Sequence, residues 1–290
     1  MKLATIELEG RQSVVALVDT PAGKVWPLDR WAQDMLHLIR CWDAIRGRLS
    51  SDGEGIELEQ VQLKAPIPRP ARNIFCVGKN YHDHAQEFAK SGFDTSAKPA
   101  AGAIPKAPIV FTKAPECVVG HMDVVRYPTG VSEQIDYEAE LGVVIGKGGR
   151  GISRERALSH VWGYTIINDV TARDLQSRHQ QWFLGKSLDA FCPMGPWIVT
   201  ADEVLPDSLR VQCWVNGELR QDGQTRDLIF DVPTLITTIS AGMTLHAGDI
   251  IATGTPAGVG IGFDPPRFLK PGDEVSIEIS GIGRLTNRID

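Results

Sequence analysis

The chain has 290 residues, of which 42% are hydrophobic and 23% are charged, and its formal net charge is −6 at pH 7. This composition excludes a disordered or collagen-like chain, because the apolar content suffices for a packed interior. The acidic balance argues against a nucleic-acid partner, which needs a basic surface. The sequence contains no apolar run long enough for a membrane span and no apolar signal segment at its start, so we expect a cytoplasmic protein without a membrane partner.

The first part of the chain predicts a small α/β domain. Alternating apolar residues over 3–27 predict two or three short strands, and apolar residues at helical spacing over 28–49 predict a helix that packs on them. Three prolines then fall within residues 64–71, where they disfavour both a helix and a central strand. We therefore place a domain boundary here, with a small N-terminal domain at 1–67 and a larger domain at 68–290.

The second domain is predicted to be mostly β, which makes the fold class α+β. A short apolar strand at 73–78 precedes a helix at 80–90, and a loop over 91–108 is long enough to act as a lid. Helices are otherwise predicted only near 154–161 and 232–241. Strands are predicted over 109–111, 123–128, 136–146, 163–169, 195–201, 210–217, 249–254 and 274–280.

The cysteines indicate reduced, buried thiols. They are odd in number, widely spaced and without a CxxC pair, which disfavours both disulfides and a zinc site. The five residues are Cys41, Cys76, Cys117, Cys192 and Cys213.

Acidic residues at 136, 138 and 140 alternate within a predicted strand, which places Asp136, Glu138 and Glu140 on one face. A solvated face is the ordinary interpretation, but the apolar run over 141–145 leads the strand into the core. There, adjacent carboxylates repel unless a cation or protons neutralise them. A further carboxylate, Asp169, ends another apolar strand. Hard oxygen ligands without nearby histidine pairs favour Mg²⁺, Mn²⁺ or Ca²⁺ over Zn²⁺.

Three other features could take part in catalysis. His84 and Glu87 share a face of the predicted helix, so the carboxylate can orient the imidazole as a general base; the alternative is a surface pair. Lys186 is either a group that stabilises an oxyanion or donates a proton, or an ordinary surface lysine. The glycine-rich stretch at 252–262 has amides and threonine hydroxyls suited to hold a carboxylate, unless it is a flexible turn.

Residues 146–151 match the GxGxxG pattern of dinucleotide-binding loops, and Asp169 follows at about the distance of 20 residues that the pattern requires. Two features argue against this interpretation. Ser153 is expected to cap a helix that begins after Gly151, and no alternating βαβ series surrounds the motif. We therefore expect a plain loop and no nicotinamide cofactor.

Six stretches of the sequence, taken together, resemble the fumarylacetoacetate hydrolase family. They are VGKNYHDHAQE, PIVFTKAP, DYEAELGVVIG, NDVTARDLQ, GKSLDAFCPMGPWIV and GDIIATGTPAGVG. The resemblance runs from Arg72 to the C-terminus, and the preceding residues are similar to the family's small leading domain. It implies a mixed β-sandwich roll around a magnesium site, and a homodimer.

The resemblance also implies roles for individual residues. The metal ligands are Glu138, Glu140 and Asp169; the catalytic residues are His84, Glu87 and Lys186; the substrate-binding residues are Arg173, Gln176 and Thr255. One departure is His121, which stands where relatives often have proline and leaves the shape of the substrate open.

The implied activity is magnesium-dependent hydrolysis of a carbon–carbon bond in a 2,4-dioxo acid, of the acylpyruvate or fumarylpyruvate type, through an enolate held by the metal. His84 would deprotonate the attacking water, and Lys186 would stabilise the oxyanion. Two alternatives use the same site: decarboxylation of an oxaloacetate-like keto acid and isomerisation of a hydroxymuconate-type dienoate. A metal-stabilised binding protein without turnover is a third. The expected partner is therefore a small keto acid.

Overall fold

The structure, a computed structural model, describes residues 1–8, 14–51, 53–93 and 104–290. Most of the loop expected over 91–108, and with it the expectation of a lid, lies outside these residues. Among the described helices, none combines the length and the apolar character needed to cross a membrane.

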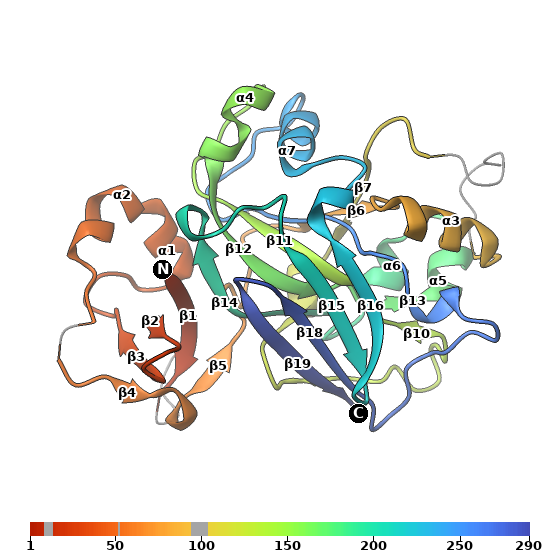
Figure 1. The fold of residues 1–290 in the computed structure, drawn as a ribbon, viewed down its shortest axis with the longest axis horizontal. Coiled ribbons are helices and arrows are strands. Elements are labelled where there is room, and N and C mark those ends of the chain that lie inside the picture. The colour runs from red at the N-terminus through yellow and green to blue at the C-terminus, as the bar shows by residue number, and fades with distance from the viewer. Residues whose placement is uncertain (9–13, 52, 94–103) are drawn as a thin grey trace.

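A mixed sheet of twelve strands runs through the molecule (Figure 1). Its strands follow the order β4-β3-β2-β1-β14-β12-β11-β17-β6-β7, with β5 paired to β1 and β8 paired to β14. Their bounds are β1 Lys2–Glu7, β2 Val14–Asp19, β3 Lys24–Pro27, β4 Ile56–Glu57, β5 Gln62–Lys64, β6 Ile74–Gly78, β7 Ile109–Lys113, β8 Val118–Val119, β11 Ala139–Ile145, β12 Val161–Asn168, β14 Cys192–Thr200 and β17 Ile250–Ala252. Because Leu3 of β1 pairs with Ile198 of β14, the N-terminal strands extend the central sheet. The domain boundary after residue 67 stays a prediction.

A second sheet of five strands packs against β11, β12 and β14 to form the sandwich (Figure 1). Its order is β16-β15-β18-β19-β9, with bounds β9 Val124–Val125, β15 Arg210–Val215, β16 Glu218–Gln224, β18 Glu274–Ile279 and β19 Gly283–Ile289. Sequence reasoning missed β16 and β19. In β16 the sequence ELRQDGQ has a single apolar residue, so it gives no alternating apolar signal.

Seven short α-helices flank the sheets within the described part of the chain. They are α1 Met35–Arg40, α2 Trp42–Ile45, α3 His82–Lys90, α4 Arg154–Ala157, α5 Arg173–Arg178, α6 Phe183–Lys186 and α7 Val232–Ser240. The expectation of one helix over 28–49 is wrong. The side chain of Asp34 accepts a hydrogen bond from His37 N at 2.7 Å and caps α1, so the helix begins only at residue 35.

The strand expected over 136–146 is interrupted. Its first part, β10 (Ile135–Asp136), pairs with β13 (Thr171–Ala172) in a separate two-stranded sheet, whereas β11 begins at Ala139. The expectation that Asp136 shares a strand face with Glu138 and Glu140 is therefore wrong.

The GxGxxG stretch is a loop, as expected. The strand before it, β11, pairs antiparallel with β12, an arrangement that a βαβ unit does not contain. The helix after it, α4, begins at Arg154, beyond the last glycine of the motif.

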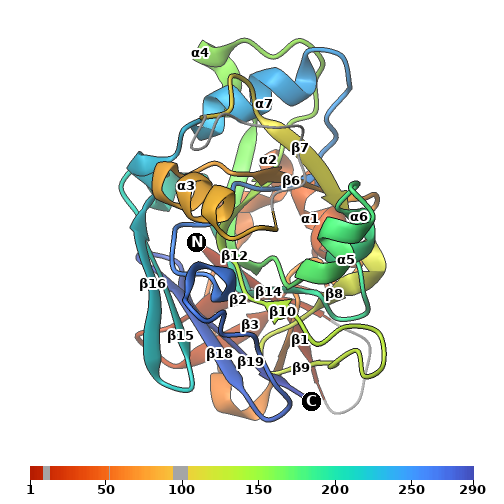
Figure 2. The ribbon, with the colours of Figure 1, turned by 90° about the vertical axis from the view of Figure 1, so that its right-hand side faces the viewer.

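Helices α3, α5 and α6 lie at the end of the molecule opposite the N-terminal strands (Figure 1), and Figure 2 shows them from that end. Helix α6 packs on β7 and on α5. These three helices carry most of the residues to which the sequence assigns a catalytic or substrate-binding role.

Candidate metal centre and active site

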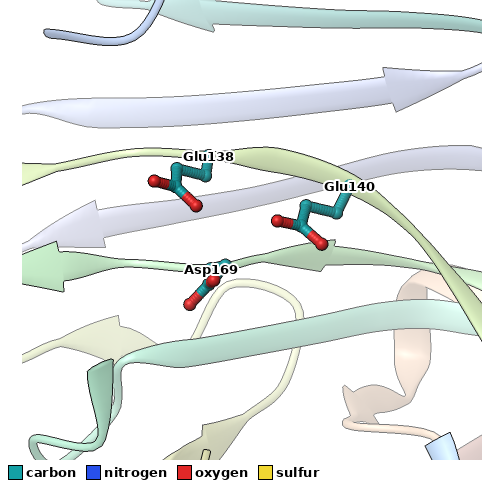
Figure 3. A group of neighbouring side chains, drawn as sticks. All are labelled: Glu138, Glu140 and Asp169. Carbon is teal, nitrogen blue, oxygen red and sulfur yellow. The ribbon is translucent and has the colours of Figure 1, made fainter. Parts of the chain in front are cut away.

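Three carboxylates meet where β11 begins and β12 ends (Figure 3). One oxygen from each of Glu138, Glu140 and Asp169 lies within 4.8 Å of the others, and all three residues are buried. The register of the two strands explains this meeting. Ala139 pairs with Asn168, so the flanking residues 138 and 169 are brought side by side, and Asp169 N donates a hydrogen bond to Glu138 O at 2.9 Å.

Lys186 bridges two of these carboxylates. Its Nζ lies 2.7 Å from Glu138 Oε2 and 2.7 Å from Asp169 Oδ2. The residue is only 1% exposed, so the alternative of an ordinary surface lysine is wrong. Because an ammonium group has three N–H donors, one remains for a group in the adjoining cavity.

Lys113 is a second cation at Asp169, and sequence reasoning did not single it out. It ends β7, is fully buried, and its Nζ donates to Asp169 Oδ1 at 2.7 Å and to Val170 O at 3.0 Å. Burial alone lowers the pKa of an ammonium group, but the Asp169 carboxylate outweighs it and holds the pKa of Lys113 above its ordinary value. The available signal was a lysine two residues after the apolar run in PIVFTKAP.

The two glutamates of the acidic cluster have opposite pKa shifts. Burial opposes the ionisation of both, but Lys186 and Arg173 hold the pKa of Glu138 at about 2. Glu140 forms no ion pair with any described residue, and burial together with Asp169 and Glu138 raises its pKa well above the ordinary value. A bound cation would relieve this repulsion. Three oxygen ligands without sulfur or imidazole fit Mg²⁺, Mn²⁺ or Ca²⁺, so the residues present are suited to a divalent metal.

His84 and Glu87 form the expected pair on α3. His84 Nδ1 lies 3.1 Å from Glu87 Oε2, and His84 is only 4% exposed, which excludes the surface pair. With the Nδ1 proton donated to Glu87, Nε2 is the unprotonated nitrogen and is available as a base. The carboxylate of Glu87 has a second partner, since its Oε1 accepts a hydrogen bond from Gly258 N at 2.9 Å.

The acidic cluster adjoins a narrow cavity that is partly open to solvent. Aromatic rings of Phe88, Phe111 and Trp182 form part of its wall. All the expected catalytic and substrate-binding residues line the cavity except Glu87, which lies behind His84. These lining residues are His84, Lys186, Arg173, Gln176 and Thr255.

Arg173 offers one unused donor at this cavity. Its Nε lies 2.9 Å from Asp136 Oδ2, and its Nη1 lies 2.7 Å from Glu138 Oε1 and 3.1 Å from Gln176 Oε1. By contrast, Nη2 is buried and has no hydrogen-bond partner among the described residues. An unpaired buried donor is costly, so this nitrogen is suited to receive an anionic oxygen of a ligand.

The glycine-rich stretch at 252–262 binds carboxylates, but they belong to the protein. Gly254 N donates to Glu140 Oε2 at 2.7 Å, Gly258 N donates to Glu87, and Gly260 N donates to Asp136 Oδ1 at 2.6 Å. The expectation that these amides are free for a substrate carboxylate is therefore wrong for these three. The loop instead links a candidate metal ligand, the Glu87 partner of His84 and the Asp136 partner of Arg173.

Thr255 is held by a residue that sequence reasoning missed. Gln221, on β16, donates from Nε2 to Thr255 Oγ1 at 2.7 Å and to Pro256 O at 2.7 Å. Its Oε1 accepts a hydrogen bond from Ala139 N at 3.1 Å, which joins the second sheet to the start of β11. Nothing in the polar sequence of β16 marks this glutamine as different from its neighbours.

Comparison with known proteins agrees with this geometry. The chain is 55% identical over 233 residues to the oxaloacetate tautomerase YisK of Bacillus subtilis, which covers 80% of this chain and 74% of the relative. A fumarylacetoacetate hydrolase from psychrophilic Exiguobacterium antarcticum has a similar structure, with a TM-score of 0.83, 43% identity and coverage of 100% of this chain and 99% of that chain.

A second solved structure bears on the acidic cluster. Maleylpyruvate hydrolase from Sphingobium sp. SYK-6, in complex with manganese(II) ion and pyruvate, matches with a TM-score of 0.81 and 31% identity, and covers 100% of this chain and 98% of that chain. The sequence pattern described as "Fumarylacetoacetate (FAA) hydrolase C-terminal" matches residues 73–290. The chain therefore belongs to the fumarylacetoacetate hydrolase family.

Proposed function

We propose that this chain is a divalent-metal-dependent tautomerase of oxaloacetate or a similarly short 2-oxo dicarboxylic acid. The observation that carries this proposal is the buried, unpartnered Nη2 of Arg173 beside the acidic cluster. A donor of this kind next to a cation site suits a substrate with two anionic groups, one for the metal and one for the guanidinium. The 55% identity to an oxaloacetate tautomerase supports the same substrate class.

The side chains supply the proton transfers that tautomerisation needs. Nε2 of His84 removes a proton from C3 of the keto acid, while Glu87 keeps the imidazole in the required tautomer. The third N–H of Lys186 donates a hydrogen bond to the C2 oxygen as negative charge builds there. The proton is then returned to that oxygen, so the product is the enol and no atom is gained or lost. A divalent metal, when bound by Glu138, Glu140 and Asp169, supplies Lewis-acid stabilisation.

The experiment follows enol and keto oxaloacetate by ultraviolet absorbance with the purified chain and Mg²⁺ or Mn²⁺. We expect interconversion faster than with metal alone, and loss of the acceleration with EDTA. A rate equal to that of metal without protein would overturn the proposal.

Hydrolysis of a 2,4-dioxo acid is the second candidate, and the His84–Glu87 pair favours it. The carboxylate of Glu87 is fixed by both His84 and Gly258 N, as a base that activates water requires. Release of pyruvate from an acylpyruvate in the presence of Mg²⁺ would establish this activity, and its absence would remove it. The expected homodimer is likewise a proposal, which size-exclusion chromatography with light scattering tests.

A further inference from the structure

Lys79 is a further cation at the cavity, and the proposed proton transfers do not use it. The residue is only 8% exposed, and its Nζ lies 5.0 Å from the centroid of the Phe88 ring. Cζ of Arg173 lies 5.9 Å from the same centroid, and both residues line the cavity. Two positive side chains therefore border the cavity at Phe88.

The backbone fixes the position of Lys79. Its φ is 54°, in the left-handed region that residues other than glycine seldom occupy, and such strain persists only where the surrounding structure holds the chain. The next residue, Asn80, provides this hold. Its Nδ2 donates hydrogen bonds to Phe230 O at 3.0 Å and to Thr253 O at 2.7 Å, and its Oδ1 accepts one from Phe230 N at 2.8 Å. The start of the Lys79 side chain is therefore held in one place, as a binding residue requires.

Three aromatic rings connect Lys79 to the other lysine of the cavity. Trp182 contacts both Phe111 and Phe88, with ring centroids 5.2 Å and 6.1 Å apart, respectively. Nζ of Lys186, which contacts the acidic cluster, lies 5.1 Å from the centroid of the Phe111 ring. Lys186 is thus at the Phe111 ring and Lys79 is at the Phe88 ring. A short ligand that lies along these rings meets one lysine with each end.

We propose that Lys79 determines specificity by binding the carboxylate that a dicarboxylic 2-oxo acid carries at the end opposite its 2-oxo group. The oxygens of this carboxylate accept hydrogen bonds from Nη2 of Arg173 and from Nζ of Lys79, while the 2-oxo end lies at Lys186 and the acidic cluster. An ammonium group beside apolar rings is shielded from water, which strengthens its attraction for an anion. Lys79 therefore favours a dicarboxylate over a 2-oxo acid with an uncharged end. The inference rests on the proposed function, which supplies this class of substrate.

The test compares oxaloacetate with its 4-methyl ester, which keeps the 2-oxo acid end and lacks the second charge. Wild type should have a KM for oxaloacetate lower than its KM for the ester by about tenfold or more. Lys79→Met should remove this preference by raising the KM for oxaloacetate, with little change in kcat or in the KM for the ester. Methionine is unbranched at Cβ, as lysine is, so the substitution leaves the backbone strain unchanged. Lys79→Arg keeps the charge and should keep most of the preference.

Lys90→Met is the matched control. Lys90 is exposed at the end of α3 and is not among the described residues that line the cavity, so this variant removes the same charge without touching the site. It should keep the preference of wild type. A loss of preference in Lys90→Met as large as that in Lys79→Met would overturn the inference, as would a rise in KM that is equal for acid and ester in Lys79→Met.

Calorimetric titration of the Mg²⁺-loaded chain with both ligands separates this inference from the proposed function, because binding needs no turnover. Tighter binding of oxaloacetate than of the ester, dependent on Lys79 but without tautomerisation, would support the inference and overturn the proposed function. Tautomerisation without this preference would overturn the inference alone. The absence of both would overturn both.

Discussion

Asp136 and Arg173 form a fully buried ion pair, with 2.9 Å between Asp136 Oδ2 and Arg173 Nε. The other oxygen of Asp136 accepts a hydrogen bond from Gly260 N at 2.6 Å. One carboxylate therefore fixes the guanidinium that faces the cavity and also fixes the glycine-rich loop. Asp136 itself does not line the cavity, so it acts through Arg173 and not on a substrate.

Replacing Asp136 should impair binding more than turnover. Asp136→Asn leaves the buried Arg173 charge with Glu138 as its remaining ion-pair partner, and breaking a buried pair costs up to about 3–5 kcal/mol of stability. We expect a lower melting temperature and a KM for the keto acid that rises more than kcat falls. The control is Asp222→Asn, because Asp222 pairs with Arg210 at an exposed site, with 2.8 Å between Arg210 Nε and Asp222 Oδ1. That change should cost less than about 1 kcal/mol. Equal losses in both variants would contradict this role.

The two glutamates of the acidic cluster should have opposite effects on the metal-free protein. The pKa of Glu140 is raised in the fold, so above its unfolded pKa its ionisation disfavours folding. Metal-free Glu140→Gln should therefore melt higher than metal-free wild type at pH 7, and the difference should shrink as the pH falls toward the unfolded pKa. The same variant should lose metal-dependent turnover and bind Mn²⁺ more weakly by about tenfold or more.

Glu138→Gln provides the opposite case. The pKa of Glu138 is held at about 2, so its charge stabilises the fold above the unfolded pKa, and this contribution is lost as the pH falls toward 2. Metal-free Glu138→Gln should melt below metal-free wild type at pH 7. Thermal melts in EDTA across a pH series measure both variants. Shifts of the same sign at pH 7 would contradict the electrostatic account.

His84→Ala should separate the possible reactions. Removing a general base costs about 10²–10⁴-fold in rate, so we expect tautomerisation and any hydrolysis of an acylpyruvate to fall by this amount. Decarboxylation of oxaloacetate needs no activated water and should persist. The measurement compares the rates of tautomerisation, hydrolysis and decarboxylation at saturating Mg²⁺. The control is the Mn²⁺ affinity, which should not change because His84 is not among the acidic ligands. Tautomerisation at the wild-type rate would exclude His84 as the base.

The acidic cluster could be found from the sequence because its signals are local. Glu140 begins an apolar run and Asp169 ends one, and an ionised side chain at such a place needs a cation. The His84–Glu87 pair is local as well, since a separation of three residues on a helix suffices to bring the side chains together.

Contacts that depend on the tertiary fold gave no such signal. Lys113 meets Asp169 across 56 positions, and Gln221 meets Thr255 across 34 positions, so no helix or strand period connects either pair. Asp136 has the same spacing from Glu138 as Glu140 has, but its pairing with Arg173, across 37 positions, removes it from the cluster. Local patterns therefore identified candidate ligands, whereas the residues that hold them in place required the three-dimensional structure.

Gly262 should be required for the position of Glu87. A methyl group at residue 262 would overlap Glu87 Oε1, the end of a flexible side chain, so Gly262→Ala should displace that carboxylate while the fold persists. Loss of the Glu87 contact should lower the rate of tautomerisation, because the imidazole of His84 loses the carboxylate that orients it. The matched control is Gly242→Ala, where an added Cβ meets no atom within 4 Å. Melting temperatures of both variants should stay near wild type, and an unchanged rate of tautomerisation in Gly262→Ala would contradict the role of Glu87.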